Sequence, residues 1–131
     1  MPASGEALLD TSVVIPFLKK DAPLRQKFQE ANTLYLPLTV LGELYCGVHL
    51  SANPAKTRTD IENFLNGVVL LLPDAATADH YGQIRAALAK AGTPIPENDI
   101  WIAAFAKEYQ LPLVARDSHF DQIAGLSVLK W

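Results

Sequence analysis

Apolar residues in this chain occur in two kinds of segment that alternate along it. Short, almost wholly apolar runs bounded by Gly, Pro or acidic residues predict buried strands. These strands are expected at residues 7–9, 34–36, 68–72 and 113–115, with a weaker one at 127–129. Longer segments, in which apolar residues recur every three or four positions, predict amphipathic helices. These helices are expected to begin near residues 11, 23, 39, 54, 77 and 98 and to end near residues 18, 31, 50, 67, 91 and 109.

Particular residues at the ends of these segments predict where helices begin and end. Thr39 is expected to cap the start of the third helix, because its side chain can accept a hydrogen bond from a free N–H group there. Asn98 or Asp99 is expected to cap the start of the last helix in the same way. Pro54 is typical of a first helical residue, and Gly92 is typical of the position just beyond a helix end.

Strands that alternate with helices predict a parallel sheet covered by helices on both faces. The expected fold class is therefore α/β, a three-layer α/β/α sandwich with a central, mostly parallel sheet of four to five strands. A length of 131 residues suits one domain, residues 1–131, with a substantial core. No apolar run approaches the roughly 18 residues of a membrane span. Since the N-terminus also lacks the pattern of a signal peptide and Cys46 is the only cysteine, we expect a cytoplasmic protein without a disulfide.

Four carboxylates follow closely on apolar runs of this pattern. They are Asp10, Glu43, Asp99 and Asp117. In open parallel sheets, ligands bind beyond the carboxyl ends of the strands, where the strand order reverses, and all four acids can reach one such edge. Acids are costly next to a core unless something compensates them. Four converging acids also repel one another, so the pattern predicts a bound cation.

Carboxylates are hard oxygen ligands, which select Mg²⁺ or Mn²⁺ over softer metals. Two such ions, held about 3.5–4 Å apart, can stabilise both the attacking and the leaving oxygen of a phosphodiester. Phosphodiester hydrolysis is therefore the reaction that fits four acids in a chain without a nucleophilic Ser, Cys or Lys motif. A net charge of −3 argues mildly against nucleic-acid binding, although bound cations would offset it. The Lys and Arg residues are scattered, so a basic patch must be assembled in three dimensions.

The acidic motifs resemble those of a known family. The strings LLDTSVV, TVLGELYCGV, ENDIWIAAFA and LVARDSHFDQIAGLSVLKW are similar, in this order, to the PIN domain and more closely to the VapC-type ribonuclease toxins of bacterial toxin–antitoxin pairs. The resemblance covers essentially the whole chain. It implies an endoribonuclease that depends on Mg²⁺ or Mn²⁺, is usually a homodimer and is neutralised by a small antitoxin protein. It also implies products with a 5′-phosphate and a 3′-hydroxyl.

The resemblance also assigns roles to individual residues. It places Asp10, Glu43 and Asp99 at the metal and in catalysis, and it places Asp117 there either directly or through water. Each acid has a plainer explanation as well, because Asp10, Asp99 and Asp117 could cap helices or turns and Glu43 could face solvent. The match of all four motifs favours the metal role.

Other polar residues near these motifs carry weaker expectations. Thr11 and Ser12 either support the metal ligands or bond to the helix start. Arg116, beside Asp117, is favoured over Arg85 as a contact for phosphate or a balance for the acids. The histidines show no metal-ligand spacing with one another and are expected to be surface or structural residues. They are His49, His80 and His119.

Two other enzyme classes share a small α/β fold with an acid cluster. A receiver domain needs paired acids after its first strand, whereas Leu9 precedes Asp10 here. A haloacid-dehalogenase-type phosphatase needs Asp-x-Asp, whereas Ser12 stands at the second acid position. Two alternatives within the PIN-like class remain: a catalytically inactive binding module, which would not need all four acids, and a nuclease that acts on DNA.

Overall fold

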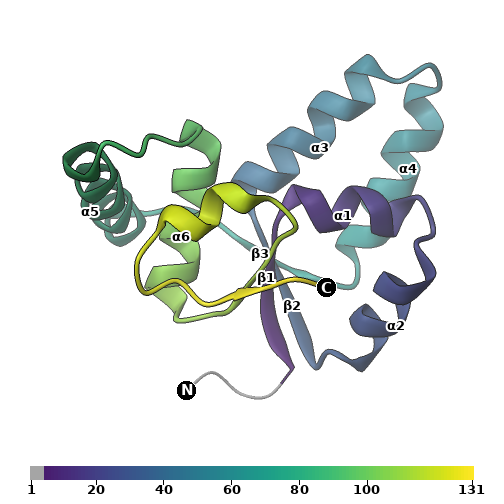
Figure 1. Cartoon of the computed structure of the whole chain (residues 1–131). Helices are drawn as coiled ribbons and strands as arrows, with labels where there is room; N and C mark the ends of the chain where they lie inside the picture. Colours follow the sequence, from purple (N-terminus) through teal and green to yellow (C-terminus); the bar gives the residue numbers. More distant parts are fainter. Residues whose placement is uncertain (1–4) are drawn as a thin grey trace.

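A single parallel sheet organises the molecule, and its strand order is β3-β2-β1-β4-β5 (Figure 1). The structure, a computed structural model, describes residues 5–131. Every strand pair is parallel. The strands are β1 (Glu6–Leu9), β2 (Thr33–Pro37), β3 (Val69–Leu71), β4 (Leu113–Val114) and β5 (Val128–Leu129). The predicted α/β class is therefore confirmed, with a sheet that is wholly and not only mostly parallel.

Helices connect the strands and cover the sheet. They are α1 (Thr11–Leu18), α2 (Ala22–Glu30), α3 (Leu38–Leu50), α4 (Pro54–Leu65), α5 (Ala75–Ala91) and α6 (Glu97–Tyr109), followed by the short 3₁₀ helix η1 (Ser118–Gln122). Figure 1 shows α1, α2 and α4 to one side of the sheet and α5 and α6 to the other. Within residues 5–131, no helix is both long and apolar enough to cross a bilayer.

The core lies around the central strand β1 and the inner faces of the helices. Leu8 and Leu9 of β1 are completely buried, as are Phe105 of α6 and Phe120 of η1. Burial of large apolar side chains from all three layers is the main favourable contribution to folding. It also fixes the carboxyl end of β1 and the start of α6 against one another.

The order of strands reverses beside β1. The chain passes from β1 outward to β2 and β3, and then returns to form β4 and β5 on the other side of β1. The backbone N–H of Asp10 donates to the carbonyl of Val114 over 3.0 Å, which holds the ends of β1 and β4 together. Since ligands of parallel sheets bind at such a reversal, this edge is the expected position of a site.

Two predicted helix caps are wrong, and proline is the reason in both cases. Helix α3 begins directly after Pro37, and α6 begins directly after Pro96, with no side-chain cap at either start. Each proline is itself the cap residue, and its side chain has no oxygen that could accept a hydrogen bond from the first helical N–H groups. Thr39 therefore lies inside α3, and Asp99 is the third residue of α6, where its side chain is available for other contacts.

Candidate metal centre

Asp10 joins the end of β1 to the start of α1. Its Oδ2 accepts hydrogen bonds from the Ser12 backbone N–H (3.1 Å) and from Ser12 Oγ (2.5 Å), so Asp10 is a helix cap as well as a candidate ligand. Only 4% of Asp10 is exposed. Ser12 Oγ also accepts the backbone N–H of Arg116 over 2.9 Å, which links this corner to the chain beyond β4. Ser12 thus fixes the orientation of the Asp10 carboxylate at the helix start.

Glu43 reaches the same corner from the second turn of α3. Its Oε1 accepts a hydrogen bond from Thr11 Oγ1 over 2.8 Å, and the residue is half-buried. The plainer explanation, in which Glu43 simply faces solvent, is therefore wrong. Thr11 and Ser12 stand next to each other at the start of α1, and each fixes one acid of the centre.

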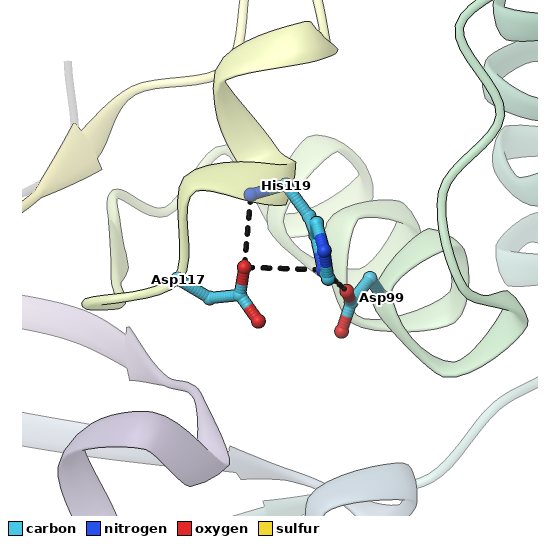
Figure 2. Close-up of side chains that lie close together, drawn as sticks. All are labelled: Asp99, Asp117 and His119. Atoms are coloured by element: carbon cyan, nitrogen blue, oxygen red, sulfur yellow. Dashed lines mark hydrogen bonds and ion pairs between the residues drawn. The ribbon is translucent and has the colours of Figure 1, made fainter.

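Asp99 and Asp117 converge on one histidine ring, as Figure 2 shows. His119 Nδ1 lies 2.8 Å from Asp99 Oδ2 and 3.1 Å from Asp117 Oδ1. The backbone N–H of His119 donates to Asp117 Oδ1 over 2.9 Å, which makes Asp117 the cap of η1. One ligand atom from each of the three residues lies within 4.8 Å of the others.

These residues line a hollow, hereafter the acidic hollow, of about 420 Å³. It is lined by Glu43, Pro96, Glu97, Asn98, Asp99, Asp117 and His119. Three of the four predicted acids therefore share one hollow. The fourth, Asp10, is buried next to it, close enough for the charge of Asp117 to raise its pKa.

Burial and mutual repulsion make these acids hard to ionise without a cation. The pKa of Asp10 is raised chiefly by burial, and the pKa of Glu43 is raised by burial and then by the charges of Asp10 and Asp99. The pKa of Asp99 is also raised, again chiefly by burial. The pKa of His119 is raised because its ring bonds to Asp99. The three acids favour a positive neighbour, and their oxygens, together with one nitrogen of the neutral His119 ring, fit Mg²⁺ or Mn²⁺.

Two residues of the hollow were not expected from the sequence. His119 was interpreted as a surface or structural residue, because spacing to other histidines was the criterion. The position of His119 two residues after Asp117 could have indicated its contact with that acid. A 3₁₀ turn capped by Asp117 brings the His119 ring back to the Asp117 carboxylate. Glu97 is the first residue of α6, two positions before Asp99, and lies at the rim of the hollow.

The fold and the site define an α/β protein with a carboxylate-rich hollow where its strand order reverses. The chain belongs to the PIN-domain family, whose model matches residues 7–126. It is 35% identical over 128 residues to the Ribonuclease VapC2 of Haemophilus influenzae. This match covers 95% of this chain and 96% of that protein. It is 34% identical over 127 residues to the tRNA(fMet)-specific endonuclease VapC of Shigella flexneri, with the same coverage.

A similar structure has also been solved. The chain matches one from the DNA-bound VapBC of Salmonella typhimurium with a TM-score of 0.91 and 32% identity, covering 96% of this chain and 98% of that one. The resemblance drawn from the acidic motifs is therefore confirmed at the level of the family.

Proposed function

We propose that this protein is a metal-dependent endoribonuclease that hydrolyses RNA phosphodiester bonds and acts as the toxin of a toxin–antitoxin pair. The observation that carries the proposal is the convergence of Asp10, Glu43, Asp99 and Asp117 where the strand order of a PIN fold reverses. The ribonuclease names of the similar proteins support the same reaction. The catalytic unit is one domain, residues 1–131, acting in the cytoplasm.

In this proposal the acids hold Mg²⁺ or Mn²⁺, which lowers the pKa of water and stabilises charge on the phosphate when bound. Asp99 and Asp117 supply oxygens at the hollow, and His119 can add a nitrogen. Ser12 holds Asp10 and Thr11 holds Glu43, each through a hydrogen bond from its hydroxyl group. Glu43 has a raised pKa and is half-buried, which suits it to take the proton from the attacking water.

The test of this function is cleavage of RNA by the purified protein. The wild type is compared with Asp10→Asn in Mg²⁺, Mn²⁺ or EDTA, on total bacterial RNA and on an initiator tRNA transcript, because one relative is named for tRNA(fMet). We expect discrete fragments with 5′-phosphates that need both metal and Asp10. Undiminished cleavage in EDTA or by Asp10→Asn would contradict the proposal, and so would cleavage of DNA alone.

The antitoxin is proposed to bind a groove of about 630 Å³ between α1, α2 and α4. Its floor carries the rings of Phe17, Phe28 and Phe64. Lys20, Arg25, Lys56 and Asp60 are among the charged residues that line it. A groove of this kind fits an amphipathic peptide with acidic residues. The similar VapBC structure supports such a partner.

A homodimer is the proposed assembly, and exposed apolar residues of α3 support it. Leu50 is 82% exposed and Leu38 is 40% exposed. Contact with a second copy of the chain would remove this apolar surface from water. Sedimentation as a strict monomer at micromolar concentration would contradict this assembly.

A further inference from the structure

Arg85 of α5 stands at the rim of the acidic hollow. Its Nη1 lies 2.9 Å from Glu97 Oε1 and donates to the Tyr81 hydroxyl over 2.8 Å. The Tyr81 hydroxyl in turn donates to Glu97 Oε2. Since Glu97 lines the hollow together with Asp99, these bonds tie a guanidinium to one wall of the hollow.

An aromatic pair supports this arrangement. The rings of Tyr81 and Trp101 are stacked, with centroids 4.1 Å apart and planes inclined by 17°. The Arg85 Cζ atom lies 6.0 Å from the Tyr81 centroid. Trp101 belongs to α6, the helix that also carries Asp99. The position of the guanidinium is therefore tied to the same rigid element as the acids.

Fold stability does not explain this arrangement. The side chains of Arg85 and Glu97 are 60% and 53% exposed, and ion pairs so open to water contribute little to stability. Within residues 5–131, the hydrogen bonds of the guanidinium all use Nη1. Its other N–H groups are left for an anion, and their planar fork matches the oxygens of a phosphate.

The second arginine near the site is held differently. Arg116 was favoured from the sequence because it precedes Asp117. In the structure its Nε donates to the Trp131 carbonyl over 2.9 Å, and its Nη1 lies 3.6 Å from Asp21. Its guanidinium is thus bonded to the C-terminus and to the cap of α2. Arg85 is the arginine whose partner belongs to the acidic hollow.

We propose that Arg85, held by Tyr81 and Glu97, binds the RNA phosphate next to the scissile one. This inference rests on the proposed ribonuclease function. RNA must bring a chain of negative charges to a hollow lined by Glu43, Glu97, Asp99 and Asp117, in a protein of net charge −3. A cation at the rim offsets this repulsion and sets the direction in which the strand crosses the metal centre.

The first experiment measures RNA binding without cleavage. In an Asp10→Asn background, a fluorescent initiator tRNA transcript is titrated at several salt concentrations. We expect Arg85→Gln to raise Kd about tenfold at low salt, because it removes a charged hydrogen bond. The slope of log Kd against log salt should fall by roughly 0.7–0.9, the contribution of one phosphate contact. Arg85→Lys should restore part of the affinity, because it keeps the charge.

Two control variants separate phosphate binding from other effects. Lys90→Gln removes a positive charge from the last turn of the same helix and should leave Kd unchanged. Glu97→Gln keeps an oxygen that can accept from Arg85 and Tyr81 but removes one negative charge from the hollow, so RNA should bind more tightly. Equal weakening by Arg85→Gln and Glu97→Gln would overturn the inference, because the pair would then act only by holding the rim in place. A changed oligomeric state in Arg85→Gln would overturn it as well, in favour of an interface role.

The second experiment compares cleavage by the wild type and by Arg85→Gln with Asp10 intact. Loss of a contact that is made equally before and during the reaction raises KM and leaves kcat unchanged, which is the result expected for Arg85→Gln. If the wild type cleaves RNA and Arg85→Gln has the same Kd and KM, the inference fails while the proposed function stands. If the wild type does not cleave RNA but Arg85→Gln still weakens binding, the proposed reaction fails while the phosphate contact stands.

Discussion

At the scale of single residues, each acid of the candidate centre has its own neighbour that holds it. A serine hydroxyl bonds Asp10, a threonine hydroxyl bonds Glu43, and one imidazole joins Asp99 to Asp117. Hydrogen bonds of this kind orient metal ligands and keep them close together. They also reduce the cost of burying charges before a cation arrives.

The threonine hydroxyl is the simplest of these contacts to remove. Thr11→Val keeps the shape of the side chain but removes the donor to Glu43. We expect cleavage to fall by about 10–100-fold, the usual effect of losing a group that orients a metal ligand. Thr11→Ser keeps the hydroxyl and should retain most of the activity. Equal activity of the valine and serine variants would show that Glu43 does not depend on Thr11.

The residues of the site differ in how far the sequence could predict them. The position of each acid after an apolar run was enough to expect that all four meet, since parallel strands end at one edge. Asp99, Asp117 and Glu43 do share a hollow. The role of His119 depends on the path of the 3₁₀ turn after Asp117, and that of Arg85 on the packing of α5 against α6. Local patterns do not contain such packing.

At the scale of elements, one buried threonine links α5 to α6. Thr77 is completely buried and its Oγ1 lies 2.6 Å from Glu108 Oε1. The same oxygen accepts the backbone N–H of Asp74, whose side chain in turn caps Thr77. This capping box fixes the start of the helix that carries Arg85.

Removing this hydroxyl should loosen the contact between the two helices. We expect Thr77→Val to lower the free energy of unfolding by about 1–3 kcal/mol, because it leaves buried polar partners without a bond. Urea unfolding measures the change. Thr59→Val is the matched control, since Thr59 is exposed on α4 and its hydroxyl donates to the carbonyl of Ala55 in its own helix. Its effect should stay within about 0.5 kcal/mol.

The elements themselves were largely predictable, and the errors have physical causes. Alternating apolar runs and helical spacings located the strands and helices to within a few residues. The starts of α3 and α6 were misplaced, because proline begins a helix without a capping side chain. Strand β3 was expected from a purely apolar run, yet Val69 is 45% exposed, because β3 is an edge strand. Strand order depends on the whole chain, so the run alone could not indicate that exposure.

At the scale of the whole molecule, the titrating groups of the centre affect stability in the same direction. Asp10, Glu43 and Asp99 have raised pKa values in the folded state, so their contribution is present below their ordinary pKa of 3.8 or 4.5 and is lost as pH rises through the folded values. His119 has a pKa raised above 6.5, so its contribution is present below 6.5 and is lost above its folded pKa. The metal-free protein should therefore lose stability from mildly acidic to mildly basic pH.

Thermal unfolding in EDTA tests this dependence. We expect Tm to fall between about pH 5 and about pH 8. Mg²⁺ or Mn²⁺ should raise Tm more at the higher pH, since the cation binds the ionised acids. Asp10→Asn removes one buried acid and should flatten the fall, whereas Asp79→Asn, on the exposed side of α5, should not change it. A Tm that rises with pH in EDTA, or that neither Mg²⁺ nor Mn²⁺ changes, would contradict the proposed cation site.

Binding of the antitoxin should respond to a single position in the proposed groove. Asn63 and Glu62 are exposed neighbours on α4, and of the two only Asn63 lines the groove. We therefore expect Asn63→Trp to weaken binding of the proposed antitoxin by about tenfold or more, because the indole fills the space of the peptide. Glu62→Trp adds the same bulk outside the groove and should bind as the wild type does. Calorimetry with each variant measures the affinity, and RNA cleavage without antitoxin checks that both variants remain active. Equal weakening by both variants would contradict binding in the groove, because added bulk would then weaken antitoxin binding outside the groove as much as inside it.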